Sequence, residues 1–444
     1  MKLETGSIGR RWLITMSLFF FLAINFADKA LIGLAAEPIM RELHLSHTEF
    51  GRIAASFFTF FSIASMAVGL LSNRIQTRWL LFAMAVTWSI AQIPLLLVAT
   101  PVTLVASRML LGASEGPAYP VALHSLYKWF PDHERAVPTA VLTVGSAFGV
   151  GIVAPAITAV IVAHGWRTAF LVLAVVGLVW SVVWLFVGKE GRIESHGAHG
   201  GAAASSEPDA LAAKLPLWKL LLCRTYVGAN LTGFAAYALL TIQTIWLPSY
   251  LVRVDGYSLT QVGWIAVLPA FGLMVASPLL GWWSHRLMAR GVSSRHARGT
   301  LGSAVVAVSG IALVLMPALP PGPLLVAVLT IAFSVTSFTF VTGGLLAAEV
   351  APVAQRGGVL GINVCITTLA GFVTPAVMGQ IIDHAATPIA GYRFGMTLAG
   401  VIAIGAAIVG MLLINPAADR RRFAALASRR AQRSMSAPLA AGEQ

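Results

Sequence analysis

Apolar residues run in long blocks along almost the whole chain, and short polar stretches separate the blocks. A helix of about 20 apolar residues spans the hydrocarbon core of a bilayer, and blocks of this length recur from Trp12 to Ile414. The pattern predicts an all-α membrane protein with twelve transmembrane helices. They are expected at 11–36, 48–72, 78–99, 102–128, 136–163, 166–188, 217–250, 259–285, 299–318, 322–350, 357–382 and 392–414.

Composition supports a membrane protein. Hydrophobic residues make up 57% of the chain and charged residues only 11%, with a mean hydropathy of +0.82. A soluble chain of 444 residues would need more polar surface. The apolar run from Trp12 is too long for a signal peptide. Cys223 and Cys365 lie far apart in apolar segments and predict neither a disulfide nor a metal site. No phosphate loop, catalytic triad or metal-ligand spacing occurs, so we expect no enzyme activity and no cofactor.

The net charge of +13 is distributed unevenly between the two sides of the predicted helices. Of the 30 Lys and Arg residues, 23 lie on the side of both termini and five on the other. Positive loops stay in the cytoplasm, so the pattern predicts a multi-pass protein of the cell's inner membrane with both termini cytoplasmic. The expected macromolecular partner is the lipid bilayer, with the basic tail on anionic headgroups, and not a nucleic acid.

Residues 189–216 differ from the rest of the chain because they are rich in Gly, Ala, Ser and charge. This composition predicts a cytoplasmic linker between two sets of six helices. The predicted organisation is an N-terminal six-helix bundle at 1–188, the linker, a C-terminal six-helix bundle at 217–414 and a basic cytoplasmic tail at 415–444.

The two halves repeat each other. "GLLSNRI" at 69–75 recurs as "GWWSHRL" at 281–287, and "IVAPAIT" at 152–158 recurs as "FVTPAVM" at 372–378. Each pair falls at the same place in its six-helix set with the same orientation, which indicates a parallel repeat. Two such bundles face each other across a central cavity and can rock to expose it to either side. The pattern predicts a secondary transporter, expected to be a monomer.

These features resemble the major facilitator superfamily over nearly all of the chain. The superfamily's loop between its second and third helices carries a glycine, an aspartate and basic residues. Here Gly69, Arg74 and Arg78 match, but Asn73 replaces the aspartate. The corresponding loop of the second half has His285 at that position. The resemblance implies alternating access, although the usual charge relay in these loops is altered.

Four charged residues fall deep within the predicted membrane segments: Asp28, Lys29, Arg108 and Glu115. Embedded charges cost at least a few kcal/mol each and are functional candidates; the alternative is a static ion-pair cluster that fixes packing. At a rise of 1.5 Å per residue, Asp28, Lys29 and Arg108 share a depth, with Glu115 one to two turns deeper. Arg108 and Glu115 share a helix face. Pro117 is expected to bend this helix just beyond Glu115.

The four charges sum to zero, which suggests how substrate and proton could be coupled. An anion that pairs with Lys29 or Arg108 would displace a carboxylate, and the displaced carboxylate would take a proton. We therefore predict that Asp28 and Glu115 bind protons, and that the protein carries a small organic anion together with protons.

Several motifs resemble the anion:cation symporter family within this superfamily. "RMLLGASEGPAYPVALHSLYKWFPDHERA" from Arg108 is similar to the family's fourth helix, and "IWLPSYL" at 245–251 to its seventh. "INFADKALIGLA" is similar to its first helix, with Lys29 in place of the usual arginine. Members carry sugar acids, phthalate-like aromatic acids, sialic acid or glutamate. The resemblance implies that Asp28 binds a proton and that Lys29 meets the substrate carboxylate.

The predicted substrate-binding set combines the two cations with polar and aromatic residues. Its members are Asn25, Lys29, Arg108, Tyr119, Tyr237, Gln243 and Trp246. The family often has a tyrosine and a glutamine in the second helix, where Phe61 and Ser65 stand here, and an asparagine in the eleventh, where Thr367 and Thr368 stand. The loss of polar partners favours a carboxylate with few hydroxyl groups, including aromatic acids.

The alternative within the superfamily is a proton-coupled exporter of a drug or metabolite. Such exporters usually carry Gly-Pro in the fifth helix, whereas Gly149 is followed here by Val150. A membrane-embedded enzyme or sensor would need a catalytic cluster or a sizeable soluble domain. The sequence predicts neither.

Overall fold

The computed structural model describes residues 8–71, 75–191, 215–352 and 355–436. Within these ranges the chain is helical and has no strand, which confirms the predicted all-α class. Nine helices are long and apolar enough to cross a membrane, or ten if one bent pair counts as a single span. The predicted count of twelve is higher by two because it includes the expected helices at 48–72 and 102–128, which are not among the nine or ten.

The N-terminal half follows the six predicted segments, most of them as a long helix with a short companion. The elements are α1 (Ile8–Leu34), α2 (Ala36–Glu42), α3 (His47–Leu71), α4 (Thr77–Gln92), α5 (Pro94–Leu97), α6 (Pro101–Glu115), α7 (Ala118–Tyr127), η1 (Asp132–Glu134), α8 (Ala136–Gly151), α9 (Val153–His164) and α10 (Trp166–Val187).

The C-terminal half is built in the same way. Its elements are α11 (Leu217–Leu221), α12 (Arg224–Ile245), α13 (Leu247–Arg253), α14 (Leu259–Ala289), η2 (Arg295–Thr300), α15 (Leu301–Leu315), η3 (Met316–Ala318), α16 (Pro323–Ser334), α17 (Ser337–Val350), α18 (Arg356–His384), α19 (Pro388–Leu413) and α20 (Pro416–Ser436).

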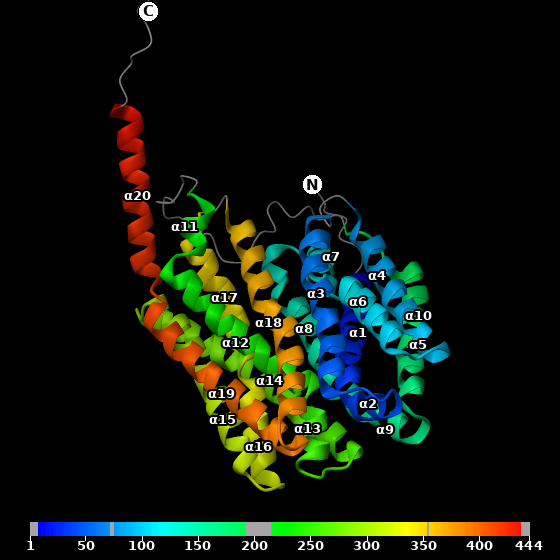
Figure 1. Cartoon of the computed structure of the whole chain (residues 1–444). Coiled ribbons are helices and arrows are strands. Elements are labelled where there is room, and N and C mark those ends of the chain that lie inside the picture. The colour runs from blue at the N-terminus through cyan, green and yellow to red at the C-terminus, as the bar shows by residue number, and fades with distance from the viewer. Residues whose placement is uncertain (1–7, 72–74, 192–214, 353–354, 437–444) are drawn as a thin grey trace, which may run out of the picture.

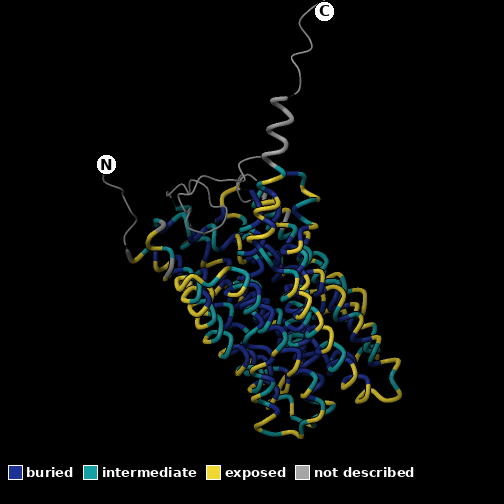
Figure 2. The backbone as a smooth tube through the Cα atoms, turned by 90° about the vertical axis from the view of Figure 1, so that its left-hand side faces the viewer, coloured by how far each residue is buried: buried dark blue, intermediate teal, exposed yellow. Residues whose placement is uncertain are grey.

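The two halves stand side by side, with α3 and α18 packed against each other between them (Figure 1). The start of α1 and the end of α19 lie at the same end of the bundle, here called the N/C end (Figure 1). Buried positions fill the interior and exposed positions face outward along the helices (Figure 2). Many outward positions are large and apolar, such as Phe186 and Leu412, which suits contact with lipid.

Two of the predicted helices are interrupted near the centre of the bundle. The predicted helix at 102–128 is α6 and α7, separated by Gly116 and Pro117, so the helix is interrupted where the bend was expected. The predicted helix at 217–250 is α12 and α13, which meet at 51°. Pro248 has no N–H to donate to the carbonyl of Thr244, and the chain bends there because that helical bond is missing.

Close packing joins the halves at the end opposite the N/C end. A Cβ atom on Gly33 of α1 would lie 1.8 Å from the carbonyl oxygen of Thr244 in α12. A Cβ atom on Gly51 of α3 would lie 2.3 Å from the carbonyl oxygen of Pro375 in α18. Only glycine allows backbones to approach so closely. The halves are therefore in direct contact at this end, here called the closed end.

The predicted linker at 189–216 lies mostly outside the described residues. Its start is held to the N-terminal half, because Glu190 accepts hydrogen bonds from the backbone N–H groups of Thr77 and Arg78 and pairs with Lys128. The predicted tail begins as α20. Asp419 accepts a hydrogen bond from the N–H of Thr225 at 2.9 Å, so the tail starts docked on the C-terminal half.

Gly112→Ala tests the packing inside the N-terminal half. A Cβ atom there would lie 2.0 Å from the carbonyl oxygen of Phe57, so α3 and α6 must move apart. We expect the free energy of unfolding to fall by about 1–3 kcal/mol, read as a lower melting temperature of the detergent-solubilised protein. Gly405→Ala is the control because no atom lies within 4 Å of its Cβ position. Equal melting temperatures for the two variants would contradict the close α3–α6 contact.

Candidate functional site

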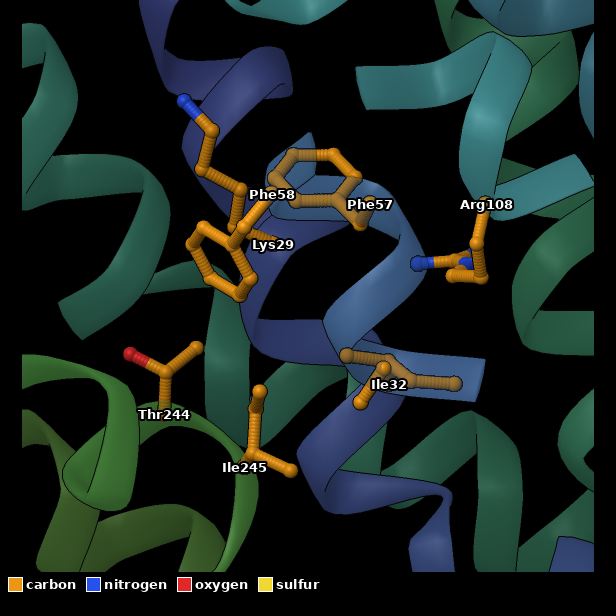
Figure 3. Close-up of a pocket in the computed structure, with 8 residues that line it drawn as sticks. Lys29, Ile32, Phe57, Phe58, Arg108, Thr244 and Ile245 are labelled. Carbon is orange, nitrogen blue, oxygen red and sulfur yellow. The ribbon is translucent and has the colours of Figure 1, made fainter. Parts of the chain in front are cut away.

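A small cavity lies between the two halves. Helices α1, α3 and α6 supply one wall, and α12 supplies the other. Figure 3 shows the side chains of Lys29 and Arg108 on opposite sides of Phe57 and Phe58. The lining residues are Lys29, Ile32, Ala54, Phe57, Phe58, Arg108, Thr244 and Ile245. The cavity therefore combines two cations with mostly apolar walls.

Asp28 of α1 lies beside this cavity and is 2% exposed. Its Oδ1 accepts a hydrogen bond of 3.1 Å from Nε2 of Gln92, the last residue of α4. Its Oδ2 is buried and has no hydrogen-bond partner among the described residues. Sequence reasoning missed Gln92. The signal for it was a single amide in an apolar helix, placed just before the break at Pro94.

Lys29 is held by its own helix and by aromatic rings. Its Nζ donates a hydrogen bond of 2.7 Å to Oδ1 of Asn25, one turn earlier. The same nitrogen lies 4.2 Å from the ring centre of Phe26 and 5.0 Å from that of Phe61. Cation–π contacts of this kind hold an ammonium group without neutralising it. Lys29 thus lines the cavity, while Figure 3 shows its ammonium group directed away from Ile32 and Ile245.

Arg108 and Glu115 lie one above the other on α6, and both are buried. The Arg108 guanidinium carbon lies 5.3 Å from the ring centre of Phe170 in α10. Neither carboxylate oxygen of Glu115 has a hydrogen-bond partner in the described part of the chain. A buried carboxylate without a partner is much more stable protonated than ionised.

The four charged groups act on one another at a distance. Asp28 and Glu115 interact electrostatically with both Lys29 and Arg108. No ion pair within 4.0 Å joins any two of them in the described ranges. The sequence analysis expected carboxylates paired with the cations. The structure instead places hydrogen bonds and aromatic rings against the cations, because Asn25, Phe26 and Phe170 occupy those positions.

The remaining predicted substrate residues lie at varied distances from the cavity. Tyr237 packs on Phe58, with ring centres 6.0 Å apart. Tyr119 lies in α7, where its hydroxyl is 3.2 Å from the Thr143 hydroxyl. Trp246 is fully buried beyond the cavity, towards the closed end. Gln243 precedes the lining residue Thr244 without lining the cavity itself. Their contact with substrate stays a prediction.

Two polar contacts join the halves at the closed end, and the sequence did not predict them. Glu37 of α2 accepts a hydrogen bond of 2.5 Å from Nε of Arg253 in α13. Asp383 of α18 accepts hydrogen bonds from the backbone N–H groups of His47 and Thr48, at 3.1 and 2.7 Å. Asp383 thus caps the first turn of α3, a helix of the other half.

Aromatic side chains fill the space between these contacts and the cavity. The ring of Trp246 lies 5.8 Å from that of Phe50 and 6.1 Å from that of Tyr392. Phe50 belongs to the N-terminal half and the other two residues to the C-terminal half. A layer of packed rings therefore separates the cavity from the closed end. No group of three or more His, Cys, Asp or Glu side chains suited to a metal occurs among the described residues.

Comparison with known proteins identifies relatives of the whole chain. The family model of the Major Facilitator Superfamily matches residues 18–375 of the chain. A hexuronate transporter of Bacillus subtilis (strain 168) is 29% identical, over 90% of this chain and 94% of the relative. A D-galactonate transporter of Escherichia coli O6:H1 is 25% identical, over 91% and 94%. A probable sulfoacetate transporter of Cupriavidus necator is 25% identical, over 90% and 92%.

Solved structures show the same fold. A bacterial homologue of the human lysosomal transporter Spinster, solved in an inward-facing and occupied conformation, superposes with a TM-score of 0.70. The alignment covers 92% of this chain and 97% of that protein at 17% identity. A nucleoside transporter, NupG, superposes with a TM-score of 0.67 at 14% identity, over 90% of this chain and 100% of that one.

Disrupting both polar contacts at the closed end is expected to loosen it. The test uses Thr244→Cys, a thiol inside the cavity, in a chain with Cys223 and Cys365 replaced by alanine. Adding Arg253→Gln and Asp383→Asn should raise the rate of labelling from that end several-fold, since each lost contact contributes about 1 kcal/mol. A membrane-impermeant thiol reagent applied from either side measures the rate.

Arg167→Gln is the matched control for this experiment. Arg167 pairs with Glu42 at the same end, but both residues belong to the N-terminal half. Its loss should leave labelling unchanged. If Arg167→Gln increased labelling as much as the paired variant, contacts between the halves would not be what closes this end.

Proposed function

The chain belongs to the major facilitator superfamily, and from that premise we propose that it is a secondary active transporter that carries an organic carboxylate together with protons by alternating access. The observation that carries this proposal is the cavity between the halves, which both Lys29 and Arg108 line and which two buried carboxyl groups lie near. Relatives named as transporters of sugar acids and of sulfoacetate support an anionic substrate.

The two cations are the proposed substrate contacts. Arg108 presents a planar set of N–H donors that suits a carboxylate, and Lys29 adds a compact positive charge. Neither forms an ion pair within the described ranges, so an incoming carboxylate need not break one. Asn25 holds Lys29 in place through its hydrogen bond of 2.7 Å. Tyr237 supports the aromatic wall through Phe58.

Asp28 and Glu115 are the proposed proton-binding groups. While the cavity is empty, Lys29 and Arg108 help to stabilise negative charge on both carboxyl groups. A bound substrate anion neutralises those cations, and proton binding at Asp28 and Glu115 then becomes more favourable. Each ligand thereby strengthens binding of the other, which is the thermodynamic requirement for symport. The coupling acts through the field of the cations and needs no exchange of direct partners.

The walls of the cavity favour an anion with few hydroxyl groups. Among the lining residues Thr244 supplies the one hydroxyl group, while Phe57, Phe58 and three aliphatic side chains beside them supply apolar surface. A sugar acid would leave its hydroxyl groups without partners there, which costs affinity. Aromatic and short-chain carboxylates, or other small acids with apolar bodies, fit this lining better.

The membrane setting follows from the distribution of charge. By the predicted topology, Lys and Arg residues concentrate on the side where the first helix starts and the last helix ends, which is the N/C end. We propose that this end faces the cytoplasm of a cell whose inner membrane holds the protein. The transporter would work as a monomer, since the cavity forms within one chain. An exporter of cationic drugs is the second candidate, and the acidic pair Asp28 and Glu115 is the feature that would favour it.

A thermal-shift screen against carboxylates at two pH values tests the substrate class. A ligand at 100 times its Kd stabilises the folded state by about 2.7 kcal/mol, so aromatic or short-chain acids should raise the melting temperature more at the lower pH. Arg108→Met should abolish the shift. Stabilisation chiefly by sugar acids would contradict the argument from the cavity walls. A response to organic cations alone would favour the exporter.

Glu115→Gln tests the proton coupling. With the best ligand of that screen as substrate in proteoliposomes, we expect the variant to lose accumulation driven by a pH gradient, because a glutamine side chain carries no exchangeable proton. Counterflow without a gradient should remain, since Arg108 and Lys29 are intact. Glu42→Gln, a carboxyl group at the closed end and far from the cavity, is the control. Gradient-driven accumulation by Glu115→Gln would refute the proposed role.

A further inference from the structure

Gln92 is the last residue of α4, where Pro94 begins the next short helix. It is fully buried, and its one hydrogen bond in the described structure is the donation from Nε2 to Oδ1 of Asp28 at 3.1 Å. A buried amide normally satisfies both its donors and its acceptor. In Gln92 the acceptor, Oε1, has no hydrogen-bond partner among the described residues.

The unmatched atoms on the two side chains form a complementary set. Oε1 of Gln92 and Oδ2 of Asp28 are both buried acceptors without a partner among the described residues. The two side chains already meet through their other atoms. Where these two acceptors approach each other they repel, and neither can supply a hydrogen. One proton on Oδ2 would supply it.

We propose that Gln92 is a positioning residue that recognises the protonated form of Asp28 as a cyclic carboxyl–carboxamide pair. In this pair Nε2–H of Gln92 continues to donate to Oδ1 of Asp28, while the added proton on Oδ2 is donated to Oε1. Nothing else is consumed or released. Gln92 therefore does more than solvate a carboxylate: it makes the uptake of a proton at Asp28 more favourable.

The charged surroundings of Asp28 act in the opposite direction. Arg108 from α6 and Lys29 from its own helix favour its ionised form, and Glu115 from α6 opposes it. The bond that Gln92 already donates to Oδ1 also favours the ionised form. The second bond, gained only when Asp28 is protonated, must therefore outweigh this effect. In this setting the pairing with Gln92 offsets the effect of the two cations on the protonation of Asp28. A substrate anion that neutralises them would leave the pairing with Gln92 to hold the proton. That Asp28 carries a transported proton rests on the proposed function, whereas the pairing itself does not.

The test is an infrared difference titration of the purified, substrate-free protein. The carboxyl band of Asp28 is identified by its loss in Asp28→Asn. In Gln92→Met, which keeps the length but not the polar atoms, we expect the midpoint for protonation to move about one unit towards lower pH, the size of one net hydrogen bond. The carbonyl band should also move to higher frequency, because its hydrogen bond from Nε2 is lost.

A midpoint that moves to higher pH would overturn the proposal, since Gln92 would then merely stabilise the ionised carboxylate. An unchanged midpoint would overturn it as well. Ser89→Ala is the matched control, because Ser89 is equally buried one turn earlier in α4 and bonds only to the carbonyl oxygen of Ala85. It should leave both the midpoint and the band in place.

Gln92→Glu provides a second variant should Gln92→Met fail to fold. Two facing carboxyl groups share one proton tightly, so one protonation step should move to higher pH than in the wild-type protein. Absence of that step would show that the two side chains do not face each other. Because these titrations need no substrate, a chain that fails to transport carboxylates would refute the proposed function and leave this inference standing.

Discussion

The placement of four charges inside the bundle without direct pairing, three of them buried and Lys29 partly buried, is the constraint on which the rest of the site depends. A charge deep in an apolar bundle is costly unless something compensates for it. Here the compensation is indirect: Asn25 and aromatic rings hold Lys29, the ring of Phe170 lies against Arg108, and Gln92 reaches Asp28. The cations remain available for a ligand, and the carboxyl groups remain sensitive to whether a ligand is present.

The direction in which the cavity can open follows from where the halves touch. Gly33 and Gly51 allow α1 and α3 to contact the backbones of α12 and α18 at one end. Polar contacts from Glu37 and Asp383, with a layer of aromatic rings beneath them, add to that closure. In the alternating access proposed here, these contacts would break while others form at the N/C end. The glycines make this possible, because small side chains let helices separate without leaving bulky groups to relocate.

Sequence periodicity predicted the fold well because a bilayer imposes a fixed length and polarity on each helix. It also predicted Asp28, Lys29, Arg108 and Glu115 as site candidates, since isolated charges are conspicuous in apolar sequence. It could not show that Gln92 bonds to Asp28 or that Glu37 meets Arg253, because the partners in each pair are distant in the chain. It misjudged how the buried charges are compensated, since aromatic rings look like ordinary packing until their positions are known.

The helix breaks show how one repeated architecture yields an asymmetric site. The chain is interrupted after α1 and again after α12, the first and seventh predicted helices, which are equivalent in the repeat. It is also interrupted between α6 and α7 and between α16 and α17, the fourth and tenth. The breaks therefore belong to the shared architecture. The membrane-embedded charges do not, because all four lie in the N-terminal half, while the C-terminal half contributes Thr244, Ile245 and the bend at Trp246. In the proposed function one half senses charge and the other supplies a surface that moves against it, so that a change in charge at α1 and α6 would change how the halves meet.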